Sequence, residues 1–153
     1  MEIKRASVED SHEIFKLQRL AFQIQAEIYN NYNIPPLTQT LEELEEVFLH
    51  KTFLKVVYNN KIVGSVRAYM NEGRCIIGKL IVHPDFQNQG IGTKLMNEIE
   101  AIFNKAKIYE LFTGHKSKKN LYLYQKLGYK EIKKEKINDK LTYVYLEKLN
   151  KKV

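Results

Sequence analysis

The first third of the chain shows the spacing of helices. Apolar residues recur every three or four positions over residues 14–28, and Ser7 followed by Asp10 has the pattern of a helix cap. The residues with this spacing are Ile14, Leu17, Leu20, Ala21, Ile24 and Ile28. The segment NNYNIPPLTQT, residues 30–40, is predicted to be a loop because its Pro pair and polar flanks disfavour a helix. Thr40 followed by Glu43 predicts a second, short helix that ends near His50.

Strand-like segments follow. Residues 2–6 predict a short first strand, and from Thr52 the period changes to that of strands. Three apolar runs, TFLKVVY, KIVGSVRAYM and RCIIGKLIVH, are separated by turn signals at residues 59–60 and 71–73. We therefore predict an antiparallel meander of three strands over residues 52–83.

The second half of the chain alternates helix and strand before it ends in a hairpin. The elements expected here are helices over 91–105 and 116–128, a strand over 107–114, and hairpin strands over 129–137 and 141–149. The predicted fold class is α/β (α+β), with a mixed, mostly antiparallel central sheet of about seven strands and about four flanking helices. We expect one domain that spans residues 1–153.

Composition excludes several classes of protein. No window approaches the roughly 18 consecutive apolar residues of a membrane span, and the N-terminus lacks the apolar core of a secretory signal. The single cysteine, Cys75, rules out an internal disulfide and suits a cytoplasmic location; its apolar strand makes it a buried, inert thiol rather than a nucleophile. The histidines are scattered without the short spacing of a zinc site, so no metal is expected.

Positive charge gathers in the second half of the chain. The net charge is +7, and residues 1–75 hold 9 Lys/Arg and 10 Asp/Glu, whereas residues 76–153 hold 16 and 8. Such a basic half is consistent with a nucleic acid, an acidic ligand or a lysine-rich solvated surface. The lysine-rich segments lack the interleaved aromatic residues of single-strand binders, so a nucleic-acid partner is not favoured.

A glycine-rich loop joins a predicted strand to the helix predicted from residue 91. Its sequence, Gln87-Asn88-Gln89-Gly90-Ile91-Gly92-Thr93, fits neither the Walker loop nor the dinucleotide fingerprint, whose third glycine is replaced by Leu95. The two glycines permit a sharp turn and a close approach of the backbone to a ligand. Amides of residues 88–93 would point outward at the positive end of the helix dipole, which favours a phosphate or pyrophosphate. The alternative is a strand-to-helix turn that uses glycine for geometry alone.

Two longer motifs resemble the GNAT superfamily of N-acetyltransferases. Leu80-Ile81-Val82-His83-Pro84, followed after a short spacer by Gln-x-x-Gly-x-Gly, is similar to motif A of that family over residues 80–95. The segment SKKNLYLYQKLGY, residues 117–129, resembles motif B, a helix that ends in Tyr-x-x-x-Gly-Phe/Tyr. Taken alone, the second segment is also consistent with an amphipathic helix closed by a glycine cap. The predicted order of elements agrees with the family fold.

The resemblance implies an N-acetyltransferase that uses acetyl-CoA as co-substrate. In such a protein the amides of residues 87–93 hold the CoA pyrophosphate, and Leu80, Ile81 and Val82 pair with the pantetheine arm. An amide near Ile81 or Val82 polarises the acetyl carbonyl, and Tyr124 donates a proton to the departing thiolate. The contact from the second helix falls to Ser117, where some members have Asn, or to Asn120, one turn before Tyr124.

The acceptor side is less defined by the sequence. The attacking amine must be neutral, so a base is needed, and His83, His115 and Glu27 are the candidates. The resemblance places acceptor binding in residues 28–41, and the expected partner is an unidentified amine of a small molecule, peptide or protein. The terminal hairpin could pair with a second copy to give a homodimer. The alternative function is a non-catalytic CoA-binding module, or a basic module that binds a nucleic acid or another partner, on the same fold.

Overall fold

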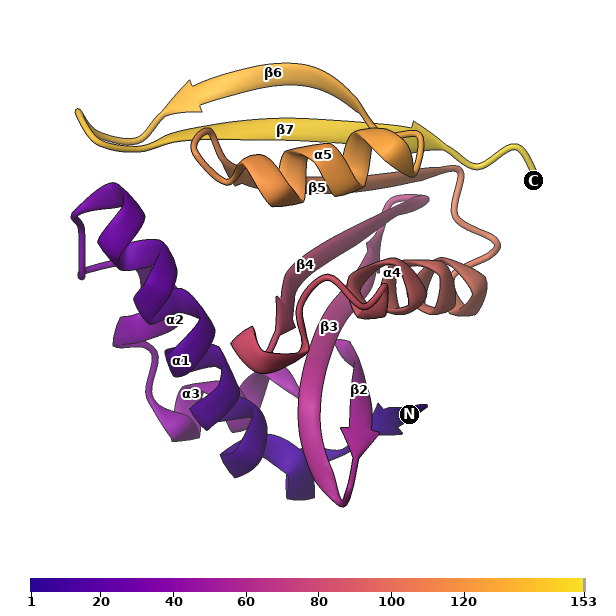
Figure 1. Cartoon of the computed structure of the whole chain (residues 1–153). Coiled ribbons are helices and arrows are strands. Elements are labelled where there is room, and N and C mark those ends of the chain that lie inside the picture. The colour runs from indigo at the N-terminus through magenta and orange to yellow at the C-terminus, as the bar shows by residue number, and fades with distance from the viewer. Residues whose placement is uncertain (153) are drawn as a thin grey trace.

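Residues 1–152 are described by a computed structural model, which contains one seven-stranded sheet and five helices (Figure 1). The helices are α1 (Ser11–Tyr29), α2 (Pro35–Thr38), α3 (Leu41–Val47), α4 (Ile91–Ile102) and α5 (Lys118–Lys126). The strands are β1 (Glu2–Ala6), β2 (Thr52–Tyr58), β3 (Lys61–Asn71), β4 (Arg74–Val82), β5 (Ile108–Gly114), β6 (Lys130–Lys136) and β7 (Thr142–Leu149). The predicted fold class is confirmed.

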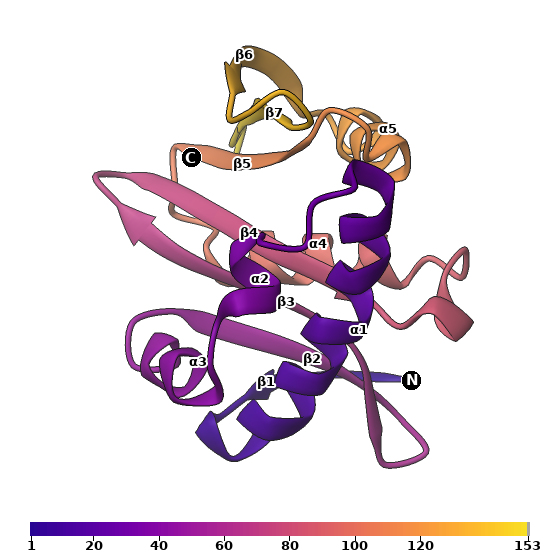
Figure 2. The ribbon, with the colours of Figure 1, turned by 90° about the vertical axis from the view of Figure 1, so that its left-hand side faces the viewer.

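The strands are ordered β1-β2-β3-β4-β5-β7-β6, and every neighbouring pair is antiparallel except β4 with β5. The meander predicted over residues 52–83 is therefore confirmed as β2, β3 and β4. Helices α1, α2 and α3 cover one face of the sheet, whereas α4 and α5 cover the other (Figures 1 and 2). We call these the α1 face and the α4 face.

The two central parallel strands separate soon after they begin. Only residues 74–76 of β4 pair with residues 108–110 of β5, although both strands continue well beyond that point. The divergence is visible in Figure 1, where β4 runs away from β5. Lys79, with φ 52°, interrupts the regular backbone of β4 near the place where its register with β3 shifts. The separation leaves one edge of β4 without a strand partner over residues 77–82.

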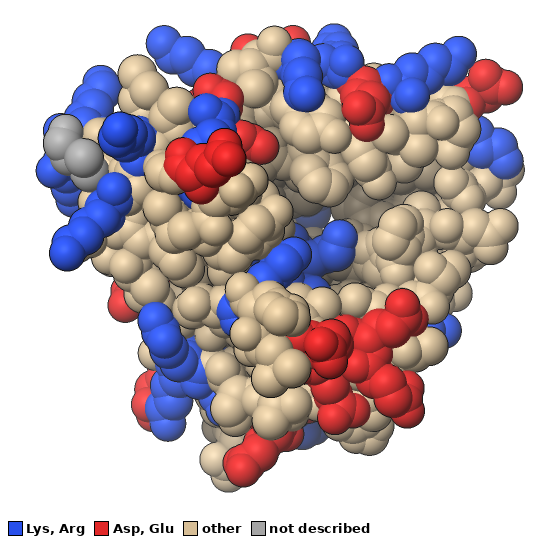
Figure 3. Space-filling view, turned by 180° about the vertical axis from the view of Figure 1, so that it is seen from behind, with Lys and Arg blue, Asp and Glu red and all other residues tan. Residues whose placement is uncertain are grey.

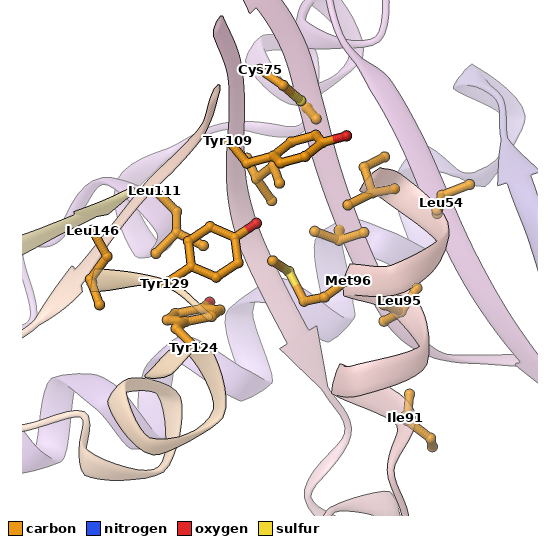
Figure 4. Packing of buried hydrophobic residues seen from close by; sticks show 14 of the residues in the cluster. Leu54, Cys75, Ile91, Leu95, Met96, Tyr109, Leu111, Tyr124, Tyr129 and Leu146 are labelled. Atoms are coloured by element: carbon orange, nitrogen blue, oxygen red, sulfur yellow. The ribbon is translucent and has the colours of Figure 1, made fainter. Parts of the chain in front are cut away.

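Two apolar cores fix the helices on the sheet. On the α4 face, Leu95 and Met96 are fully buried and pack with Tyr109, Tyr129 and neighbouring aliphatic residues, as Figure 4 shows. The helix is also tied to β7 by Glu100, whose carboxylate accepts hydrogen bonds of 2.8 Å from the Tyr129 hydroxyl and the Lys148 ammonium. On the α1 face, Ile14 and Leu17 pack with Phe53 and Ile81.

The N-terminal helices differ from the expectation in two details. The α1 helix is present, but Leu20, Ile24 and Ile28 are 43, 40 and 46% exposed. Its buried side carries Ile14 and Leu17 as expected, together with Gln18, Ala26 and Tyr29, and Tyr29 at the helix end docks on the loop before α5. The loop predicted over residues 30–40 contains the one-turn helix α2, which begins with Pro35 and Pro36, where a missing amide hydrogen costs nothing. Among the described residues, no helix has the length and apolar character to cross a membrane.

Candidate active site

The first turn of α4 lacks a side-chain cap. Its cap position is Gly90, with φ 78°, and no side chain accepts from the first amides of the helix within the described chain. Helix α3, in contrast, is capped by the hydroxyl of Thr40, which accepts from the amide of Glu43 at 3.1 Å. Unsatisfied amides at a helix start carry partial positive charge and bind anions. The first amides of α4 are therefore available to an anion, although α1, α2 and α5 also lack a side-chain cap among the described residues.

The two glycines of the loop serve different purposes. At Gly90 the requirement is conformational: a Cβ atom there would meet open space, but the left-handed backbone would be strained with any residue other than glycine. At Gly92 a Cβ atom would lie 3.2 Å from Leu123 Cδ2 of α5 and 3.7 Å from Leu80 Cδ2 of β4. The absent side chain lets the first turn of α4 approach α5 and β4 closely. Residues 87–90 are exposed, whereas Ile91 anchors the turn in the core.

The end of β4 presents backbone groups to the space between β4 and β5. Ser65 lies opposite Ile81, Gly64 lies opposite Val82, and the amide of His83 donates to the carbonyl of Val63 at 2.8 Å. Amides of successive strand residues point to opposite edges, so those of Ile81 and His83 face β3 and those of Leu80 and Val82 face the opening. Of the two amides predicted to contact the acetyl group, the one at Val82 is the one that faces the opening.

Tyr124 of α5 lies in the core of the α4 face. Its ring is 5% exposed and its centroid is 6.0 Å from that of Tyr129 (Figure 4). Burial raises the pKa of the Tyr124 hydroxyl well above its usual value, so the group keeps its proton at neutral pH. The hydroxyl makes no hydrogen bond to another described residue. A protonated phenol in this position is a potential proton donor.

Ser117 and Asn120, the two residues considered for a contact with CoA from α5, lie in different surroundings. Ser117 is buried; its hydroxyl lies 3.0 Å from the Tyr29 hydroxyl and donates to Gln25 Oε1 at 2.9 Å. The Tyr29 hydroxyl also accepts from the amide of Lys116 at 2.8 Å, so α1 and the start of α5 are locked together. The side chain of Asn120 is half-buried and has no such partner among residues 1–152.

The three candidate bases lie in different surroundings. His83 lines a groove of about 470 Å³ with Glu13, Tyr58 and Phe86, and its Nδ1 accepts from the amide of Asp85 at 3.1 Å. The Nδ1 of His115 accepts from the amide of Thr142 at 3.0 Å, which holds the start of β7. Glu27 is exposed on α1. The structure does not bring these three side chains together.

Cys75 is fully buried in the core of the α4 face. Burial, with a smaller contribution from Glu100, raises the pKa of its thiol to about 12. A thiol that stays protonated at neutral pH is a poor nucleophile. Among the described residues, no group of His, Cys, Asp and Glu side chains is arranged to hold a metal ion.

The α1 face carries one buried and two half-buried cations that the sequence pattern did not reveal. Arg67 of β3 is 3% exposed, and burial lowers the pKa of its guanidinium to about 10. Burial, together with Arg67 and Lys51, lowers the pKa of Lys79 on β4 to about 8. The pKa of Lys51 is lowered by burial and by Arg67. The available signal was a charged residue inside each of the apolar runs SVRAYM and IIGKLIV.

Comparison with known proteins agrees with this geometry. The model of the family described as the acetyltransferase (GNAT) domain matches residues 29–149 of this chain. The chain therefore belongs to the GNAT acetyltransferase family, and the resemblance of its two motifs to that family is confirmed.

Solved structures share the whole fold at low sequence identity. The PaiA N-acetyltransferase of Thermoplasma acidophilum, solved in complex with coenzyme A, is similar with a TM-score of 0.80 and 18% identity over 97% of this chain and 98% of that one. The protein smu.2055 of Streptococcus mutans is similar with a TM-score of 0.83 and 14% identity over 99% and 100% of the two chains. In sequence, the chain is 25% identical over 131 residues to the UPF0157 protein YqkA of Bacillus subtilis, covering 86% of this chain and 37% of that relative. The chain thus spans little more than a third of that relative.

Proposed function

We propose that this chain transfers an acetyl group from acetyl-CoA directly to the primary amine of an acceptor. The observation that carries the proposal is the uncapped first turn of α4 lying next to the unpaired edge of β4. Together they offer one anion site and one row of backbone partners, as a pyrophosphate joined to an extended amide chain requires. The similarity to PaiA, solved with coenzyme A, supports the same donor.

The residues of this chain would hold the donor as follows. Amides of residues 87–93 bind the pyrophosphate, and the open backbone groups of Leu80 and Val82 pair with the pantetheine arm. Since the hydroxyl of Ser117 is already bonded to Tyr29 and Gln25, we assign the α5 contact to Asn120. Acetyl-CoA supplies the activated acetyl thioester, and nothing in the chain has to form a covalent link to it.

The chemistry then needs three functions from the protein. The amide of Val82 stabilises the negative charge that develops on the acetyl oxygen, a contribution worth about 3–4 kcal/mol for a well-placed donor. The buried hydroxyl of Tyr124 gives its proton to the departing sulfur. His83 directly follows Val82, and its Nε2 has no hydrogen-bond partner in the described chain. We therefore assign to His83 the role of the base that removes a proton from the amine, directly or through water.

The proposal is tested by incubating the protein with acetyl-CoA and a panel of amines, amino acids and short peptides, and measuring release of the free CoA thiol. We expect release above the acetyl-CoA hydrolysis rate with at least one acceptor, and mass spectrometry should find the acetyl group on the amine of that acceptor. Binding of acetyl-CoA without any transfer would favour the alternative of a non-catalytic CoA-binding module. Absence of acetyl-CoA binding would overturn both.

A further inference from the structure

The α1 face holds three cationic side chains close to β4 that no carboxylate neutralises. None of the ion pairs among the described residues involves Lys51, Arg67 or Lys79. Half-buried cations elsewhere in the chain form ion pairs: Arg74 pairs with Glu110 and Glu147, and Lys55 pairs with Asp10. Arg67 is buried and Lys51 and Lys79 are half-buried, and holding cations in such places without counter-charge is costly, so the arrangement favours binding of an external anion.

Arg67 is the most informative member of this group. One of its nitrogens, Nη2, donates to Gln18 Oε1 at 2.6 Å, and its guanidinium stacks 4.6 Å from the centre of the Phe53 ring. Its Nε is the one buried side-chain nitrogen or oxygen of the described residues that lacks a hydrogen-bond partner. Buried donors are normally satisfied, so this one marks Arg67 as a guanidinium with unused hydrogen-bonding capacity.

The orientation of Arg67 is fixed by polar contacts around Gln18. Gln18 is fully buried in α1, and its Nε2 donates to the Pro36 carbonyl and to Gln39 Oε1, both at 3.0 Å. With its amide hydrogens used in this way, the oxygen of Gln18 is aimed at Arg67. The guanidinium is therefore held by α1 and the α2 segment, and this preorganisation suits recognition of a carboxylate or phosphate.

Lys51 and Lys79 are half-buried beside aromatic rings, whereas Arg67 is buried. Lys79 lies over the ring of Phe22 at 5.9 Å and Lys51 lies over the ring of Tyr69 at 4.8 Å, so aromatic faces surround the charges. Seen from behind, the molecule has a central hollow that contains Lys and Arg side chains, while acidic side chains gather on the surface below it (Figure 3). The glutamates of α3 other than the half-buried Glu45 are exposed to solvent, and none of the four pairs with these three cations.

The hollow lies next to the proposed site of transfer. Arg67 is opposite Gly78 in the β3–β4 register, and Lys79 precedes the Leu80–Val82 segment on β4. The first turn of α4, which would hold the pyrophosphate, is on the other face of the sheet. A molecule that entered from the α1 face would therefore meet β4 from the side opposite to the donor phosphates, as an acceptor must.

From this arrangement, and resting on the proposed function, we infer that the acceptor is a small primary amine that also carries a carboxylate or phosphate group, which is bound by Arg67, Lys79 and Lys51. The guanidinium of Arg67 attracts the anion by its charge, and the two lysines add charge and hydrogen-bond donors. The same three cations repel polyamines and other purely cationic amines. The acceptor site thus selects amines by an anion rather than by a second positive charge.

The inference is tested with matched pairs of acceptors in the thiol-release assay. The pairs are β-alanine with β-alaninamide and phosphoethanolamine with ethanolamine, and spermidine serves as the cationic acceptor. We expect the anionic member of at least one pair to have a kcat/KM about tenfold or more above that of its neutral partner, and spermidine to be poor. The pair that shows the larger ratio tells carboxylate from phosphate. Equal or better turnover of neutral or cationic amines would overturn the inference while leaving the proposed function intact.

Substitutions of Arg67 and Lys79 test whether these cations cause the selectivity for anionic amines. Arg67→Met and Lys79→Met should each reduce the ratio within the preferred pair towards one by raising KM for the anionic amine, while KM for acetyl-CoA stays unchanged. Arg67→Lys should recover part of the ratio. Lys130→Met is the matched control, since it removes one exposed charge on β6, far along the chain from the hollow, and should leave the ratio as it is. A ratio that survives both Arg67→Met and Lys79→Met would contradict the assignment.

A second measurement needs no turnover and covers the case in which no panel amine is acetylated. At constant ionic strength, succinate should raise the melting temperature of the wild-type protein by about 1–3 °C, whereas succinamide should not. Lys79→Met should lose most of this shift even if Arg67→Met folds poorly, and Lys130→Met should keep it. Equal effects of succinate and succinamide on the wild-type protein would overturn the inference, and so would the absence of any effect.

Discussion

The two faces of the central sheet present positive charge in different ways, one through backbone amides and the other through side chains. On the α4 face the proposed anion site consists of backbone amides at a helix start, and Gly90 and Gly92 keep side chains away from it. On the α1 face the positive charge is carried by side chains, of which Arg67 is buried and held by Gln18 and the ring of Phe53. Backbone recognition leaves a short, contiguous motif in the sequence, whereas side-chain recognition draws on residues 51, 67 and 79, which only the strand pairing brings together. The motif at the start of α4 can therefore be recognised in the sequence, whereas the group of cations becomes evident only in the fold.

The largest effect is expected from Tyr124→Phe, which removes the proposed proton donor from the α4 face. We predict a fall in kcat of about 100-fold or more, as for the loss of general acid catalysis, with little change in acetyl-CoA affinity. Tyr122→Phe is the matched control, because Tyr122 lies on the same helix but is 68% exposed. Steady-state kinetics with calorimetry separates the two effects, and an unchanged kcat for Tyr124→Phe would remove this residue from the mechanism.

A smaller effect on the same face is predicted for Gly92→Val. The added side chain meets Leu123 and narrows the approach to the first amides of α4, so acetyl-CoA affinity should fall about 30-fold, which is about 2 kcal/mol. Ala101→Val adds a similar group at an exposed position of the same helix and should bind acetyl-CoA as the wild type does. If both variants bind equally well, the amides at the start of α4 do not hold the donor.

The assignment of the α5 contact is sharpened by Asn120→Ala and Ser117→Ala. Asn120→Ala should weaken acetyl-CoA binding several-fold, by about 1 kcal/mol for one lost hydrogen bond, without changing the melting temperature. Ser117→Ala should lower the melting temperature by a few degrees, because Tyr29 and Gln25 lose their shared partner. The reverse pattern, measured by calorimetry and thermal melting, would return the contact to Ser117.

The smallest effect concerns the pH dependence of stability on the α1 face. The pKa of Lys79 is about 8 in the folded chain and about 10.4 in an unfolded one, so folding disfavours its charged form. The resulting penalty is fully present below pH 8 and is relieved as the pH rises from 8 towards 10.4. Without ligand, Lys79→Met should melt about 2–4 °C above the wild type at pH 7, and this gap should shrink by pH 10. A gap that does not vary with pH would show that Lys79 is not a buried cation.

The sequence predicted the sheet, its meander and the glycine-rich turn into α4 well, because these depend on local spacing. Alternating apolar residues and turn residues locate β2, β3 and β4, and Gly90 with Gly92 marks the start of α4. The buried side of α1 could not be predicted in the same way. Leu20, Ile24 and Ile28 fit helical spacing, yet they are exposed. Polar Gln18 is buried, because its amide group makes hydrogen bonds with Arg67 and with the carbonyl of Pro36.

The remaining features required tertiary structure. The choice between Ile81 and Val82 depends on the β3–β4 register, which fixes the direction of each amide. The choice between Ser117 and Asn120 depends on Tyr29, which lies far away in sequence and reaches Ser117 only after α1 docks. The hollow of cations likewise depends on how β2, β3 and β4 are paired, and no spacing rule brings Lys51, Arg67 and Lys79 together.

The central claim, that the α4 start and the open edge of β4 form the donor site, is tested most directly by calorimetric titration with acetyl-CoA. We predict a single site per chain with a Kd well below millimolar, that is, a binding free energy beyond about −4 kcal/mol, for the wild type and for Ala101→Val, and much weaker binding for Gly92→Val. No detectable binding of acetyl-CoA or CoA to the wild-type chain at millimolar concentration would contradict the account.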